Sequence, residues 1–158
     1  MAERIVLDTG LLIALDRVEA LDLVGRLPLE FLCPSQVRAE LDAGEAFGFP
    51  SIAPSWLKSH RLASLPSPMS MAGLDLGEAS VIQLALELGV AWVGIDEWKG
   101  RRGALAAGLR VTGSLGLLAL AKKQGIVPVL KPFVERALAA GIRYHPTVVE
   151  TILEAVGE

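Results

Sequence analysis

Four acidic residues stand at positions where a charged side chain needs compensation. Asp8 and Asp96 each end an apolar run that is typical of a buried strand, and Glu40 and Glu78 lie within helical patterns, away from each helix's polar residues. Burying an unpaired carboxylate costs on the order of several kcal/mol. A divalent cation removes that cost, because hard metal ions take oxygen ligands from such groups. The sequence therefore predicts a metal site built from these four acids.

A carboxylate set without matching histidines or cysteines favours Mg²⁺ or Mn²⁺ over zinc. Such ions leave coordination places to water and substrate phosphate, so the expected chemistry is phosphodiester hydrolysis by in-line attack of an activated water. Two further acids, Asp75 and Glu97, rank behind the four, and Glu97, directly after Asp96, is either a fifth metal ligand or a solvent-facing residue. His60 and His145 are given no role.

Helical periodicity turns both glutamates inward. At about 100° per residue, Glu40 falls among the apolar residues of the helix expected over 35–44. Glu78 falls likewise among the apolar residues of the helix expected over 76–89. It also stands in the first turn of that helix, where the helix dipole favours an anion.

Each acid taken singly has a simpler interpretation. Asp8 or Asp96 could cap the helix that follows its strand. Glu78 could merely interact with the helix dipole, and Glu40 could form an ion pair at the surface near Arg38. Convergence of all four on one edge of a sheet favours the metal site.

Three cations follow the last of these acids. Lys99, Arg101 and Arg102 stand where they could neutralise substrate phosphates, the alternative being a solvated helix start. Trp98 could stack on a base, although packing against the sheet is the favoured interpretation.

Short apolar runs alternate with helical patterns, which is typical of an α/β fold with a parallel sheet. Strands are expected near 4–8, 29–33, 91–95 and 109–112, with a weaker edge strand near 61–64. Helices are expected near 10–16, 18–26, 35–44, 76–89, 99–107, 114–124, 131–140 and 146–156. Ligands of such sheets bind beyond the carboxyl ends of the strands, where Asp8 and Asp96 stand. The proline-rich stretch 45–73 is a loose crossover or, alternatively, a flap or partner-binding surface.

Composition bounds the class of protein. A chain of 158 residues predicts a single domain over 1–158, and 52% hydrophobic residues exclude a disordered chain. The net charge of −3 argues against a broad electrostatic grip on nucleic acid, although acids of a metal site inflate that count. The lone Cys33 excludes a disulfide framework and is expected to be buried and inert. Without a targeting or membrane-spanning pattern, we expect a cytoplasmic protein.

Six blocks occur in an order typical of one nuclease family: LDTGLLIAL (7–15), CPSQVRAEL (33–41), LDLGEASVI (74–82), GIDE (94–97), GR (100–101) and VTGSLG (111–116). With them the chain resembles the PIN-domain nucleases, and more closely their prokaryotic, VapC-like toxin branch. The resemblance implies a three-layer α/β/α fold with a central, mostly parallel sheet of order 3-2-1-4-5, dependence on Mg²⁺ or Mn²⁺, and cleavage of single-stranded RNA. It places the family's four acids on Asp8, Glu40, Glu78 and Asp96.

The resemblance also implies a supporting hydroxyl, from Thr9 or Ser114. Two positions depart from the family pattern. Glu97 replaces an aspartate that many members carry, and Gly94 replaces a threonine common among toxin-type members.

Two functions of different class follow. The leading one is a toxin-like, metal-dependent endoribonuclease that forms a homodimer and is held inactive by a cognate antitoxin. The rival is a non-catalytic PIN-fold scaffold that binds nucleic acid or protein, suggested by Glu97, Gly94 and the acidic net charge. The apolar face of the helix expected over 146–156 covers the core or forms the homodimer surface.

Overall fold

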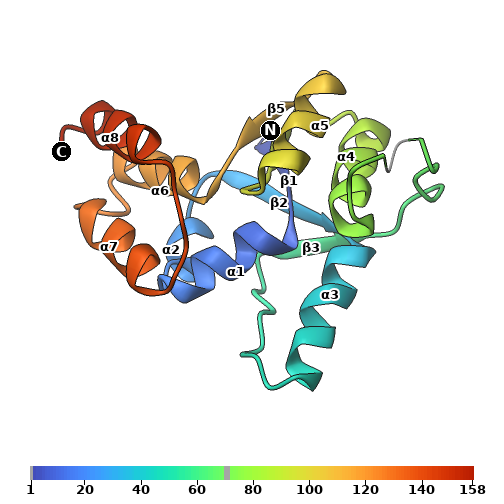
Figure 1. The fold of residues 1–158 in the computed structure, drawn as a ribbon, viewed down its shortest axis with the longest axis horizontal. Coiled ribbons are helices and arrows are strands. Elements are labelled where there is room, and N and C mark those ends of the chain that lie inside the picture. The colour runs from blue at the N-terminus through green and yellow to red at the C-terminus, as the bar shows by residue number, and fades with distance from the viewer. Residues whose placement is uncertain (1, 70–71) are drawn as a thin grey trace.

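A parallel sheet forms the centre of the molecule (Figure 1). The structure, a computed structural model, describes residues 2–69 and 72–158. The strands of this described part are β1 (Glu3–Leu7), β2 (Leu29–Pro34), β3 (Leu57–His60), β4 (Trp92–Gly94) and β5 (Arg110–Thr112). They are all parallel and run in the order β3-β2-β1-β4-β5. The predicted α/β class and strand order are confirmed.

Helices cover both faces of this sheet. They are α1 (Thr9–Arg17), α2 (Leu21–Val24), α3 (Ser35–Ala46), α4 (Leu76–Leu88), α5 (Trp98–Ala106), α6 (Ser114–Lys123), α7 (Lys131–Ala139) and α8 (Pro146–Ala155). Helices α4 and α5 cover one face and α1, α2 and α6 cover the other, while α3 contacts both α1 and α4, α7 packs on α1 and α8 packs on α6 (Figure 1). Within the described ranges, no helix combines the length and apolarity needed to cross a membrane.

The middle of the sheet brings the ends of β1 and β4 together. These two strands are direct neighbours, with Leu7 in register with Gly94, and the Asp8 amide donates to the Gly94 carbonyl at 2.9 Å. The last three residues of β1, Ile5, Val6 and Leu7, are apolar and buried because helices cover both faces of the sheet. Asp8 and Asp96 therefore follow two adjacent strands at the same edge.

Close packing explains the glycine of β4. A Cβ on Gly94 would lie 2.6 Å from Cδ2 of Leu7 and 3.0 Å from Cδ1 of Leu11. A threonine at this position would require both leucines to move, because the first turns of α1 pack directly on the strand.

The edge strand β3 was predicted four residues too late. Leu57–His60 pairs with β2, whereas 61–64 was expected. Trp56 fixes the observed register, since its ring packs edge-on against Phe31 of β2 at 4.8 Å between centroids. Backbone amides within 61–64 instead donate to the Glu87 carboxylate on α4. Residues 70 and 71 of the loose stretch lie outside the described residues.

The second predicted helix is also shorter than expected. It spans only Leu21–Val24, where 18–26 was predicted. Glu19 has a φ of 59°, in the left-handed region, so the chain turns sharply after α1 before α2 begins.

The last helix, α8, packs on α6. Val149, Ile152, Leu153 and Val156 are partly buried against the hydrophobic core. In this chain the apolar face of the C-terminal helix therefore covers the core.

Candidate active site

Asp8 is a desolvated carboxylate without a capping role. It occupies the N-cap position of α1, but its side chain makes no capping hydrogen bond, and it is only 6% exposed. Burial raises its pKa to about 7, the nearby Thr9 amide opposes this, and the charges of Asp75, Glu40 and Glu78 raise it further. Like charges, not cations, surround this group.

Glu40 projects from α3 onto the start of α4. A Cβ built on Gly77 would stand 2.9 Å from Cδ of Glu40 and would overlap its carboxylate, so the glycine leaves the space that the carboxylate occupies. The residue as a whole is exposed, yet its carboxylate is partly desolvated. Burial raises the pKa of Glu40, the Thr9 hydroxyl lowers it, and Asp75 raises it.

The Thr9 hydroxyl is the polar group left over at this point. It lies beside the Glu40 carboxylate, but Thr9 Oγ1 is buried without a hydrogen bond of standard geometry to any described residue. A buried hydroxyl usually has a partner, and an orphan next to acids is a place for a ligand or water.

Asp75 and Glu78 interlock at the start of α4. The Glu78 amide donates to Oδ1 of Asp75 at 2.8 Å, and the Asp75 amide donates to Oε2 of Glu78 at 3.4 Å, which forms a capping box. Glu78 is buried, and its pKa is raised by burial, by Asp75 and by Glu97, with the Asp75 amide opposing. Glu78 therefore also stabilises the start of α4, in keeping with its predicted position in the first turn of that helix.

Asp75 interacts with more acids of the site than was expected from the sequence, where it ranked behind the four. Its charge raises the pKa of Asp8, Glu40 and Glu78 alike. The signal was present in the sequence, because an aspartate three residues before a glutamate at the start of an apolar helix is a capping-box pattern.

Glu97 is exposed, as the second of its two expected alternatives has it, and it also holds the start of the next helix. Its side chain caps α5 by accepting the Gly100 amide at 3.1 Å, and it lies near enough to Glu78 to raise the pKa of that group. The N-cap of α5 is Glu97, so the capping alternative considered for Asp96 belongs to its neighbour.

Asp96 is held by the N-terminus of α6. Its Oδ1 accepts the Ser114 amide at 2.7 Å, and its Oδ2 accepts the Ser114 hydroxyl at 2.8 Å. Ser114 Oγ in turn lies 2.7 Å from the Tyr144 hydroxyl. Tyr144 had no sequence signal, because nothing in the spacing of the α7–α8 connection points to β4.

The four predicted acids form one group of three and one neighbour. Asp8, Glu40 and Glu78 interact electrostatically around Asp75, while Asp96 stands on the Ser114 side of the same sheet edge. As these side chains stand, no three acidic, histidine or cysteine residues of the described chain are close enough together to hold a metal ion.

The donor set nevertheless fits a hard divalent cation. Among the residues that the structure describes, no arginine, lysine or histidine forms an ion pair with Asp8, Glu40, Glu78 or Asp96. All the available donors are carboxylate oxygens beside one orphan hydroxyl, which suits Mg²⁺ or Mn²⁺. Side-chain rotation of the glutamates is needed to close a coordination shell.

The three cations expected to contact substrate, all on α5, line two different grooves. Arg101 lines a groove of about 640 Å³ that reaches Asp96, and its Nη1 donates to the Ile95 carbonyl at 2.9 Å. Lys99 and Arg102 line a different groove of about 540 Å³, beside the segment that leads into α4.

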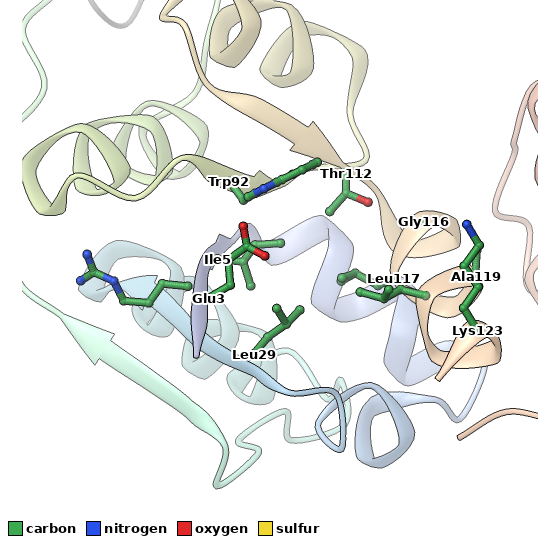
Figure 2. A pocket seen from close by; sticks show the side chains of 11 residues that line it. Glu3, Ile5, Leu29, Trp92, Thr112, Gly116, Leu117, Ala119 and Lys123 are labelled. Atoms are coloured by element: carbon green, nitrogen blue, oxygen red, sulfur yellow. The ribbon is translucent and has the colours of Figure 1, made fainter. Parts of the chain in front are cut away.

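A third hollow lies at the opposite, amino end of the strands. This cavity has a volume of about 360 Å³. Its lining side chains lie between the sheet and α6 (Figure 2). Its apolar wall includes Ile5, Leu29, Trp92 and Leu117, with Glu3 and Lys123 also in its lining. It contains none of the predicted acids, so the chemistry of the side chains places the candidate site at the other end of the sheet.

Comparison with known proteins identifies the family. The family model DUF3368, described as a PIN domain, matches residues 4–158. A search among curated proteins found no match. PIN domains are generally nucleases and typically use divalent metal ions. With its strand order and the acids at the ends of β1 and β4, the chain belongs to the PIN-domain family.

Proposed function

We propose that this chain is a metal-dependent endoribonuclease that cleaves single-stranded RNA, and that it is the toxin-like component of a toxin–antitoxin pair. The observation that carries the proposal is a group of carboxylates in a PIN fold, of which Asp8 and Glu78 are buried, with no described cation paired to them. Such a group is stable only if protons or a divalent cation compensate the charge.

The residues that would hold Mg²⁺ or Mn²⁺ are Asp8, Glu40, Glu78 and Asp96. A bound divalent cation supplies water activation and neutralises charge at the scissile phosphate. Burial leaves Asp8 poorly hydrated, so its carboxylate exchanges a proton for a cation at little further cost in desolvation. Ser114 fixes both oxygens of Asp96, which orients this carboxylate before any ligand arrives.

Cleavage of a single-stranded RNA oligonucleotide tests the proposal. We expect cutting with Mn²⁺, none with excess EDTA, and a loss of at least about 100-fold in Asp8→Asn and Asp96→Asn. Asp22→Asn is the matched control, because Asp22 is an exposed aspartate of α2 with no described ion pair. Cleavage that survives EDTA, or that is equal in Asp8→Asn and the wild type, would refute the proposal.

One observation favours the rival, non-catalytic scaffold. No three ligating side chains of the described residues stand together, and the hydrogen bonds of Asp96 and Glu97 are already made within the protein. Calorimetric titration with Mn²⁺ separates the two functions. Specific binding that Asp8→Asn abolishes supports the nuclease, whereas no binding to the folded protein supports the scaffold.

The partners belong to the same proposal. The toxin interpretation rests on the ordered sequence blocks, and the exposed rings of Phe47 and Phe49 after α3 offer apolar surface to a second copy or an antitoxin. Light scattering tests the homodimer, for which twice the chain mass of 16.7 kDa is expected. We place the protein in the cytoplasm, in keeping with the single buried thiol of Cys33, whose pKa burial raises to about 11.

A further inference from the structure

The connection between α7 and α8 reaches the candidate site through Tyr144. Its hydroxyl lies 2.7 Å from Ser114 Oγ, and Ser114 Oγ lies 2.8 Å from Oδ2 of Asp96. A carboxylate only accepts, so the single hydroxyl hydrogen of Ser114 goes to Asp96 and the Tyr144 hydroxyl donates to Ser114. This chain of hydrogen bonds ties the connection to Asp96, and Arg143 and His145, on either side of Tyr144, line the same groove as that acid.

A groove runs from Asp96 along this connection. Its volume is about 640 Å³, and its polar and aromatic lining includes Asp96, Trp98, Arg101, Arg143, Tyr144 and His145. Asp96 is the only acid in this lining, whereas the other acids of the site lie toward α3 and α4. The groove is thus positively charged beside a negatively charged site, on a chain whose net charge is −3.

Arg143 and His145 in the groove have free hydrogen-bond donors. Arg143 is exposed and forms no ion pair with a described residue. His145 caps α8 by accepting the Thr147 amide at its Nδ1, at 3.2 Å. A neutral ring that accepts at Nδ1 carries its proton on Nε2, so His145 presents an N–H donor even without a charge.

An exposed aromatic ring stands at the edge of the same groove. Trp98, the first residue of α5, is 66% exposed. The sequence favoured packing of this ring against the sheet, but most of the Trp98 side chain is exposed to water. An exposed indole beside cations is the arrangement on which single-stranded bases stack.

We infer that this groove binds the single-stranded RNA on one side of the scissile phosphate. Arg143 and His145 contact backbone phosphates, and Trp98 stacks on an unpaired base. A phosphate chain matches the spaced cations, and the exposed ring selects a strand whose bases are free, so the groove favours single-stranded over duplex RNA. This inference rests on the proposed function, because it assumes that RNA is cut at the acids.

Binding of a 2′-O-methyl RNA oligonucleotide, followed by fluorescence polarisation with Mn²⁺ present, tests the groove. A denaturing gel then checks that the oligonucleotide has stayed intact. Arg143→Gln removes one charge, and His145→Asn removes the imidazole while keeping a side chain that caps α8. The matched control is Arg26→Gln, since Arg26 is exposed, lies outside the groove and has no described side-chain contact.

We expect Arg143→Gln and His145→Asn each to weaken binding by roughly three- to tenfold, and Trp98→Ala by about tenfold. Arg143→Gln should also lower the slope of log K against log salt by about 0.7. Mn²⁺ affinity should stay unchanged in all of them, and Arg26→Gln should bind within about twofold of the wild type.

The outcomes separate this inference from the proposed function. If the wild type cuts and binds RNA but the groove variants bind equally well, the groove assignment is wrong and the nuclease stands. If the wild type neither binds nor cuts RNA, both fail. If the variants lose affinity for an oligoglutamate peptide and not for RNA, the groove takes an acidic protein and the inference is overturned.

Discussion

A single methyl group at Gly77 should damage the site without damaging the fold. Gly77 is the second residue of α4, and an added Cβ would stand 2.9 Å from Cδ of Glu40, where ordinary contact begins at 3.4 Å. The obstacle is the end of a flexible side chain, so Gly77→Ala displaces the Glu40 carboxylate and leaves the backbone in place.

The size of the effect follows from this displacement. The methyl group takes up on the order of 1 Å of the space in which the Glu40 carboxylate rotates toward a metal ion, whereas metal–ligand distances vary by only about 0.2 Å. A misplacement of about 1 Å costs roughly 100-fold in rate. We therefore expect Gly77→Ala to lower Mn²⁺ affinity at least about tenfold and RNA cleavage about 100-fold. Alanine stabilises a helix by up to about 1 kcal/mol relative to glycine, so Tm should stay constant or rise by roughly 2–4 °C.

The assay combines calorimetric Mn²⁺ binding, RNA cleavage and thermal melting without metal. Gly10→Ala is the matched control, because Gly10 is the second residue of α1 and nothing lies within 4 Å of its added Cβ. The control should gain the same helix propensity and bind Mn²⁺ normally. Unchanged Mn²⁺ affinity in Gly77→Ala, or an equal loss in both variants, would show that Glu40 is not a ligand held by this contact.

Three further predictions follow. Burial raises the pKa of Asp8 from 3.8 to about 7, so the metal-free protein loses stability as the pH rises between these values. In EDTA, Asp8→Asn should therefore melt several degrees above the wild type at pH 8 and at the same temperature as the wild type at pH 4. Equal melting temperatures at pH 8 would contradict this. Thr9→Val removes the orphan hydroxyl, so Tm should not fall while Mn²⁺ affinity does; a lower Tm with unchanged affinity would contradict the assigned role. Tyr144→Phe removes the hydroxyl that donates to Ser114. It should lower kcat several-fold at unchanged KM and lower the free energy of unfolding by about 1 kcal/mol. A loss of stability without a change in kcat would indicate that Tyr144 only packs.

The sequence was sufficient for the central part of the fold. The runs that became β1, β2 and β4 are buried on both faces, so their apolar residues mark them without ambiguity. The edge strand Leu57–His60 alternates little and includes exposed Lys58 and Ser59, and its position is set by the distant contact of Trp56 with Phe31. No local pattern carries that information.

Local sequence patterns suffice to propose the acids of the candidate site, but not to predict what surrounds them. Strand ends and helical periodicity single out Asp8 and Glu78 because both follow from local geometry. The Glu40–Gly77 contact and the Tyr144–Ser114 hydrogen bond join segments that only the folded chain brings together. His145 was given no role because a histidine before a proline looks like a loop residue, and its place in the same groove as Asp96 depends on how α8 packs on α6.

The most direct measurement is anomalous diffraction from a crystal of the wild-type protein soaked in Mn²⁺. We predict a manganese peak at the carboxyl edge of the sheet, liganded by Asp8 and at least two of Glu40, Glu78 and Asp96, with the glutamate side chains rotated toward it. No peak at saturating Mn²⁺, or a peak liganded only by acids elsewhere on the molecule, would contradict the assignment.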